Sequence, residues 1–351
     1  MRFLLLFFSI WASVAAAERV NSYDYAIDVT ERAGDLSAPW AVAIMSDDEF
    51  LVSERGGTLW HFKNGNRQSV KGVPQVWARG QGGLLDVVLA RDFATTREIF
   101  ITYSAPNGRK AGTALGVARL SDDGSRLSGF QQLFVQPKAT RGERHFGSRV
   151  VETPNGDLFL TVGDRGTADL AQSEDSTAGK VIRVRRDGTW ALHSIGHRNP
   201  QGAALDASGK LWTVEHGARG GDEVNRPARG KNYGWPEISY GTHYNGDKIG
   251  IGTAGDGFEQ PSFYWDPSIA PSGMMIYSGK LFEKWRGQMF IGSLKFDMIS
   301  RLVLSDGKAR EAERLFEDRF ARIRDIREAP DGSIWFLAVG DDALYQMRPL
   351  Q

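Results

Sequence analysis

Short apolar strands that follow small or polar turn residues recur along the whole chain. Within them apolar and polar positions alternate, which is the period of a β-strand, and no long stretch has the period of a helix. The copies lie roughly 45 to 80 residues apart, a spacing typical of repeat architectures. Six segments share this pattern: DDEFLVSE at 47–54, REIFITYS at 97–104, NGDLFLTVGD at 155–164, SGKLWTVEHG at 208–217, GQMFIGSL at 287–294 and DGSIWFLAVGD at 331–341.

Most copies are followed by a second strand. These strands are GGTLWHFK from Gly56, GVARLSDD from Gly116, GKVIRVRRDG from Gly179, SRLVLSDG from Ser300 and ALYQMRP from Ala343. Asp-Gly and Asn-Gly pairs stand where hairpin turns are expected. Repeats built from paired strands predict an all-β chain, a six-bladed β-propeller with four-stranded antiparallel blades. A pair of β-sandwiches is the alternative.

The organisation of the chain favours one domain over residues 18–351. No linker or charge run divides it. The widest gap lies between the fourth and fifth copies and contains an insertion that runs through Gly257. Long insertions between strands often carry function.

Residues 1–17 form a predicted signal peptide. Arg2 supplies the positive charge, Phe3 to Val14 are apolar, and Ala15-Ala16-Ala17 resembles a cleavage site before Glu18. The alternative is a membrane anchor, but the apolar run is too short to span a bilayer. The chain contains no Cys. We therefore expect export to a bacterial periplasm, with no membrane span in the mature chain.

The charge balance excludes one class of partner. The 43 basic and 43 acidic residues cancel, which argues against a nucleic-acid-binding surface. Gly is abundant with 41 residues, and there are 10 Trp. This composition suits many short strands joined by tight turns.

His145 is the candidate general base. It stands in RGERHFGSR, just before a strand expected to open onto the central channel. An imidazole near its usual pKa accepts protons at neutral pH. Asp164, at the end of the following strand, is placed to orient it. A histidine with a purely structural role remains the alternative.

Cations are spread over several repeats. Arg322 and Arg324 alternate in FARIRDI, so we expect them on one face of a strand. Together with Arg198 and Lys295 they are able to clamp several carboxylates. Ordinary surface ion pairs are the alternative, just as Gln81, in RGQGGLLDV, also fits a simple turn.

The segment from His197 to Pro236 concentrates polar groups in irregular, Gly-rich backbone. It reads GHRNPQG, LWTVEHG, GDEVN and KNYGWP. Asp222 and Glu223, with backbone oxygens, suit a hard cation such as Ca²⁺, although the spacing is not that of an EF-hand. A solvated acidic turn fits the spacing equally well. We expect this segment to form one wall of a pocket for a cation and an anionic cofactor.

Taken together, these motifs resemble the soluble, pyrroloquinoline quinone (PQQ)-dependent sugar dehydrogenases, a family that includes soluble glucose dehydrogenase and the aldose sugar dehydrogenases. The resemblance extends from SAPWAVA at Ser37 to the last repeat. The matching motifs occur in the family's order: GQGGLLDV, a His before GxR, VGDRG, GHRNPQG, EHG with DEVN and NYGWP, SLK and RIRD. The short insertions are more similar to the aldose sugar dehydrogenase branch.

The resemblance implies a six-bladed propeller and an enzyme that oxidises aldoses at C1 to lactones by hydride transfer to PQQ. It implies that His145 is the base, with Asp164 behind it, and that cationic groups including Arg198 stabilise developing negative charge. It implies cofactor contacts from Gln81, His145, Arg198, Asn199, Lys295, Arg322 and Arg324. It implies one Ca²⁺, which polarises the quinone, on the carbonyls of Gly217 and Ala218. A second Ca²⁺ is implied at Glu223 and the carbonyl of Tyr233.

Two departures from the family pattern affect these expectations. Arg144 stands before the base where glucose-specific members have an acid, and a neighbouring cation lowers the pKa of a histidine. Ala218 replaces a Pro of some members, which matters little if only the carbonyl is used.

The expected partners are an aldose and an external electron acceptor, and the protein is expected to be a monomer or a homodimer. The alternatives are a Ca²⁺-dependent propeller lactonase and a binding propeller without catalysis.

Overall fold

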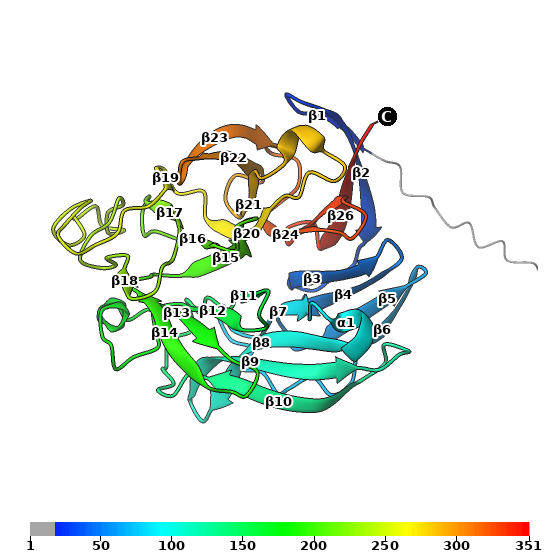
Figure 1. Ribbon diagram of the computed structural model, residues 1–351, viewed down its shortest axis with the longest axis horizontal. Coiled ribbons are helices and arrows are strands. Elements are labelled where there is room, and N and C mark those ends of the chain that lie inside the picture. Colours follow the sequence, from blue (N-terminus) through cyan, green and yellow to red (C-terminus); the bar gives the residue numbers. More distant parts are fainter. Residues whose placement is uncertain (1–17, 351) are drawn as a thin grey trace, which may run out of the picture.

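The protein is a six-bladed β-propeller. The computed structural model describes residues 18–350, so the predicted signal peptide at 1–17 lies outside the described residues. Six sheets stand around a central axis, and the four main strands of each blade pair antiparallel (Figure 1). This confirms the predicted fold class.

The blades follow one another along the chain. The first contains β3 (Pro39–Ser46), β4 (Glu49–Glu54), β5 (Leu59–Lys63) and β6 (Asn66–Ser69). The second contains β7 (Leu84–Leu89), β8 (Glu98–Asn107), β9 (Lys110–Leu120) and β10 (Leu127–Val135). The third contains β11 (Val150–Glu152), β12 (Leu158–Val162), β13 (Lys180–Val184) and β14 (Trp190–Ile195), extended by β18 (Lys231–Asn232).

The remaining blades complete the ring. The fourth contains β15 (Pro200–Leu205), β16 (Leu211–Glu215), β17 (Asp222–Asn225) and β19 (Phe263–Trp265). The fifth contains β20 (Pro271–Ile276), β21 (Met289–Ser293), β22 (Ile299–Ser305) and β23 (Lys308–Leu315). The sixth contains β24 (Ile323–Glu328), β25 (Ile334–Ala338) and β26 (Ala343–Pro349), with β2 (Ala26–Ala33) and β1 (Glu18–Asn21) at its outer edge.

The six repeat copies all correspond to the same strand of their blades. Each contains all or most of the second strand counted from the axis, namely β4, β8, β12, β16, β21 and β25. The strands predicted after them are the third strands. The pattern did not reveal the third strand of the fourth blade, β17, because it has four residues and begins with two acids.

The ring is closed by the two ends of the described chain. β2 pairs antiparallel with β26, so that Ile27 lies opposite Pro349. Both strands belong to the sixth blade, in which β26 lies between β2 and β25, and Figure 1 shows β2 and β26 side by side. Closure of this kind leaves only short, protected sheet edges, and it fixes the last blade against the first.

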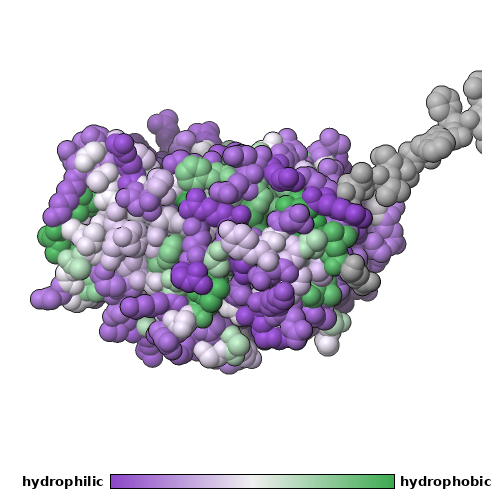
Figure 2. All heavy atoms as spheres, turned by 90° about the horizontal axis from the view of Figure 1, so that it is seen from above, coloured by the Kyte–Doolittle hydropathy of each residue, from purple (hydrophilic) through white to green (hydrophobic). Residues whose placement is uncertain are grey.

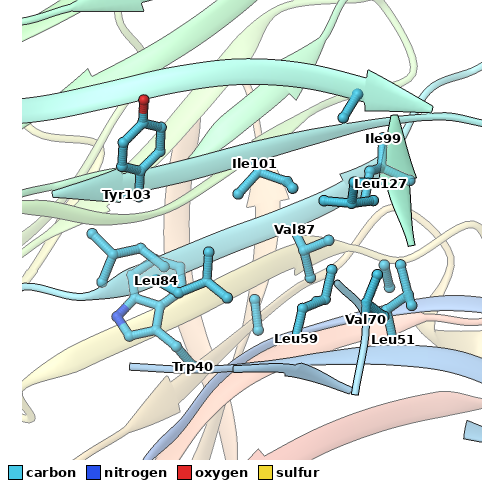
Figure 3. Packing of buried hydrophobic residues seen from close by; sticks show 14 of the residues in the cluster. Trp40, Leu51, Leu59, Val70, Leu84, Val87, Ile99, Ile101, Tyr103 and Leu127 are labelled. Atoms are coloured by element: carbon cyan, nitrogen blue, oxygen red, sulfur yellow. The ribbon is translucent and has the colours of Figure 1, made fainter. Parts of the chain in front are cut away.

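Apolar side chains fill the spaces between neighbouring blades. The largest cluster joins the first two blades through residues such as Trp40, Leu51, Leu84 and Ile101 (Figure 3). Burial of this apolar surface is the main force that holds one blade on the next. The face of the molecule that Figure 2 shows is mostly hydrophilic, with separate apolar patches.

Helical structure is sparse, as the sequence pattern predicts. It consists of α1 (Phe93–Thr96) and two 3₁₀ turns, Ala168–Ala171 and Glu283–Trp285, within the described residues. None of the helices in residues 18–350 has the length and apolar character needed to cross a membrane. The predicted insertion lies between β18 and β19 and projects beside the fourth blade (Figure 1).

Candidate active site

A cavity of about 520 Å³ opens at one end of the central axis. Its wall is built from two kinds of position: residues at or just before the start of inner strands, and residues just after second strands. Both positions lie at the same edge of every blade, because the two strands are antiparallel. The lining residues are Pro39, Trp40, Arg55, Gln81, Leu85, Phe146, Gly147, Asn199, Gln201, His216, Ala270, Leu294, Lys295, Arg322, Arg324 and Val339.

Irregular pairing directs inner-strand side chains into this cavity. The register shifts within the first residues of β3, β7, β15, β20 and β24. A β-bulge re-aims side chains and is frequent beside active sites. Trp40, Gln201 and Arg324 lie in three of these irregular segments and line the cavity.

Four cations surround the cavity without acidic partners. Among residues 18–350, no carboxylate lies within 4.0 Å of the charged groups of Arg55, Lys295, Arg322 and Arg324. Burial and repulsion from Arg149, Arg55 and Arg322 lower the pKa of Arg324 to about 9. Unneutralised cations that repel one another are stabilised by a multiply charged anion.

The two predicted strand arginines reach the cavity by different routes. Arg324 lies on β24 and donates from Nη1 to Gln201 Oε1 at 2.7 Å. Arg322 lies just before the strand with a left-handed φ of 57°, and its Nη1 donates to the Leu294 carbonyl at 2.9 Å. The expectation that both alternate within one strand is therefore wrong for Arg322, although both line the cavity.

Two amides hold the loop that carries His145. Gln81 Oε1 accepts from the backbone N–H of His145 at 2.7 Å, and Asn199 Oδ1 accepts from that of Gly147 at 3.1 Å. Both amide residues also line the cavity. The loop needs support because His145 itself has a left-handed φ of 57°.

His145 and Asp164 form a buried pair. Their Nδ1 and Oδ1 atoms lie 2.6 Å apart. Burial opposes ionisation of Asp164, but the hydrogen bond with His145 and the N–H of Gly166 keep its pKa below the usual value. An ionised Asp164 places the imidazole proton on Nδ1 and leaves the Nε2 lone pair available.

The pKa of His145 lies below its usual value. Burial is the largest cause, followed on the same side by Arg198 and then Arg144, while Asp164 acts in the opposite direction. The contribution of Arg144 is visible in the sequence, whereas the larger effect of burial depends on the fold. The imidazole is therefore neutral, and able to accept a proton, at pH 7.

A second, much smaller cavity adjoins the first. Its wall includes Arg198, Gly217, Glu223 and Tyr233, whereas Ala218, the next residue in the turn, pairs with Gly220. The structure thus brings residues predicted for two calcium ions to one cavity. His216 lines both cavities.

The environment of Glu223 disfavours its ionised form. Burial, together with the nearby carboxylates of Glu215 and Asp222, raises its pKa to about 8. The side chain of Asn225 donates to both Glu215 and Glu223, but its own Oδ1 is buried without a hydrogen-bond partner. Crowded carboxylate, amide and carbonyl oxygens are the donor set that Ca²⁺ prefers.

A buried ion network lies on the inner strands beneath the large cavity. Arg149 Nη1 lies 2.8 Å from Asp325 Oδ1 and 3.3 Å from Asp86 Oδ1, and Arg327 contacts the same two carboxylates. Arg149 also donates to the carbonyls of Gln201 and Arg324. The network therefore supports two residues of the cavity wall.

Sequence reasoning missed this network and Arg55. The buried aspartates and arginines look like ordinary polar positions of alternating strands. A signal for Arg55 did exist in the sequence. Arg55 follows the end of β4, just as His216 and Lys295 follow the ends of β16 and β21. Superposing the six copies by register would have marked all three as cavity positions.

Comparison with known proteins identifies the family of the chain. The family model for glucose/sorbosone dehydrogenases matches residues 36–346. The aldose sugar dehydrogenase YliI of Escherichia coli (strain K12) is 44% identical over 324 residues, which cover 86% of this chain and 87% of that protein. The chain belongs to the glucose/sorbosone dehydrogenase family, and it is an enzyme, a sugar dehydrogenase.

Solved structures give the same assignment. The apo-form of the soluble aldose sugar dehydrogenase from Escherichia coli is 40% identical, with a TM-score of 0.88, over 92% of this chain and 100% of that chain. A PQQ-bound form of the aldose sugar dehydrogenase from Streptomyces coelicolor is 26% identical, with a TM-score of 0.77, over 95% and 99% of the two chains. The latter structure is direct evidence that a protein of this fold holds PQQ.

Proposed function

We propose that the protein oxidises aldose sugars at C1 to lactones, with PQQ as its cofactor. The observation that carries this proposal is the set of four cations without carboxylate partners around a 520 Å³ cavity, beside a buried His–Asp pair. PQQ is a planar tricarboxylate, so its charge complements these cations.

The cavity residues divide the task of holding the cofactor. Lys295, Arg322, Arg324 and Arg55 would bind carboxylates, and Gln81 and Asn199 would support the site through the His145 loop. Arg198 would add positive charge beside His145. When bound, the quinone supplies the acceptor for a hydride from the sugar, and Ca²⁺ supplies Lewis-acid polarisation.

His145 would act on the sugar as general base. Its Nε2 would accept the proton of the C1 hydroxyl while Asp164 stabilises the imidazolium that forms. The cations would stabilise negative charge that develops in the transition state. Since neutral imidazole is required and its pKa is lowered, activity should persist at neutral pH and fall as the pH drops through that lowered pKa.

The lining of the large cavity favours this reaction over a Ca²⁺-dependent lactonase. A lactonase would need carboxylates to hold its metal in the channel. The described lining residues include four cations but no Asp or Glu.

An external electron acceptor would reoxidise the cofactor. Export to the periplasm by the predicted signal peptide belongs to the same proposal.

The decisive test is reconstitution of the purified apo-protein with PQQ and Ca²⁺. The protein should retain quinone absorbance and reduce an artificial dye with one or more aldoses. Lys295→Met should weaken PQQ binding about 10- to 100-fold, because one charge-assisted contact is lost. The control is Lys308→Met, an exposed lysine of the same blade. Absence of both quinone retention and dye reduction with every aldose would refute the proposal.

Gly217 and Ala218 would hold one Ca²⁺ through their carbonyls, and Glu223 and the Tyr233 carbonyl would hold a second. Calcium should raise the melting temperature by about 5 °C at a concentration a hundred times its Kd. Glu223→Gln should abolish most of this rise, because it removes the charged oxygen donor. Thermal unfolding with calcium and with chelator measures the effect, and Glu237→Gln, an exposed carboxylate of the insertion, is the control. Equal melting temperatures in calcium and chelator would show that the acidic turn binds no cation.

A further inference from the structure

The indole of Trp235 lies directly behind the His145–Asp164 pair. Its Nε1–H donates to Asp164 Oδ2 at 2.9 Å, while the other carboxylate oxygen, Oδ1, faces His145 Nδ1 at 2.6 Å. Trp235 therefore occupies the oxygen that His145 does not use. A carboxylate held at both oxygens has one orientation relative to the imidazole.

The indole is itself fixed by the backbone around it. The Trp235 N–H donates to the Gly196 carbonyl at 3.0 Å, and the Trp235 carbonyl accepts from Gln172 Nε2 at 2.7 Å. These bonds join it to the end of β14 and to the segment after Asp164. The NYGWP corner is thus built to hold a rigid donor at this place.

The same ring also contacts Arg198, a cation beside the His145–Asp164 pair. The guanidinium of Arg198 lies 5.2 Å from the centroid of the Trp235 ring, within the range of a cation–π interaction. The Arg198 carbonyl accepts from the backbone N–H of Asp164 at 2.8 Å. Trp235, Asp164 and Arg198 consequently hold one another in place around His145.

We propose that Trp235 is a positioning residue for proton abstraction, which keeps Asp164 aligned on His145 and Arg198 beside them. The inference rests on the role of His145 proposed above. It gives the NYGWP motif a function in the chemistry that is separate from the backbone carbonyl of Tyr233.

Loss of the indole donor should change the titration of His145 in a defined direction. Asp164 would then have one donor fewer and would bind the imidazolium more strongly. The charged or titratable groups that face His145 are Asp164, Arg198 and Arg144, with His216 from the end of β16. Trp235→Phe leaves all of them in place and keeps an aromatic ring beneath Arg198.

The test uses the apo-protein, so it does not depend on PQQ or on a sugar. NMR titration of the imidazole signals, with His145 assigned through His145→Gln, should show its midpoint in Trp235→Phe higher by about half a unit to one unit. The matched control is Trp212→Phe, which removes an indole bond to Asp206 at 2.9 Å elsewhere in the molecule. It should leave the His145 midpoint unchanged, and an unchanged midpoint in Trp235→Phe would overturn the proposal.

A second measurement needs no substitution at Trp235. In the unaltered protein its indole N–H resonance should shift with the same midpoint as His145, because both groups share Asp164; independent titrations would contradict the proposal.

A third measurement uses the reconstituted enzyme, in which Trp235→Phe should lower kcat about tenfold at constant KM. The acidic limb of its pH profile should move to higher pH, as in the NMR titration, and an unmoved limb would count against a positioning role.

Discussion

Replacement of His145 by glutamine is expected to lower the rate of aldose oxidation by about 100- to 10,000-fold, the usual contribution of a positioned general base. Glutamine preserves an amide near Asp164 but cannot accept a proton at neutral pH. The cations of the cavity remain, so PQQ binding should change little. Steady-state turnover of the reconstituted enzyme, with quinone absorbance as the measure of binding, gives both values.

The control for this substitution is His243→Gln. His243 is an exposed histidine of the insertion, and its replacement should leave turnover unchanged. If His145→Gln kept full activity, His145 would be removed from the mechanism. If it lost quinone binding as well as turnover, the residue would act mainly on the cofactor.

Arg149→Met is expected to reduce the free energy of unfolding by about 3–5 kcal/mol, the cost of breaking a buried ion network from one side. The substitution leaves Asp86 and Asp325 buried with only Arg327 as a charged partner in the network. Burial already raises the pKa of Asp86 even with both arginines in place. Urea unfolding followed by fluorescence measures the change.

The surface pair of Arg183 and Asp157 provides the comparison. Arg183 is 42% exposed, so Arg183→Met should cost less than about 1 kcal/mol. If Arg149→Met also lowered the free energy of unfolding by less than about 1 kcal/mol, the buried ion network would contribute little to stability. Because Arg149 also donates to the Arg324 carbonyl, weaker PQQ binding should accompany the loss of stability.

Much of the fold could be predicted because blade strands carry a local signal. The second strand of each blade is an apolar run after a tight turn, and all six copies of that run were correctly located. Inner strands were harder to find. β11 has only three residues, and β15, β20 and β24 begin with irregular pairing, so their alternation is weak.

The candidate site could be predicted only as separate pieces. His145 and Asp164 were paired correctly because they flank one hairpin, β11 and β12, so their distance is set locally. Trp235, by contrast, meets Asp164 across 71 residues of sequence. No local pattern encodes that contact, since it depends on the return of the chain from the fourth blade to pair β18 with β14 in the third.

The repeat, the number of blades and the motifs that mark the family can all be read from the sequence alone. Those features are local, because alternation, turn residues and strand length act over a few neighbouring positions. Which charges meet depends on the tertiary structure. The four cations of the cavity, Arg55, Lys295, Arg322 and Arg324, converge only after β2, near the N-terminus, pairs with β26 and closes the ring. Ring closure also buries Asp86, Arg149 and Asp325 together, and that desolvation makes them a structural network.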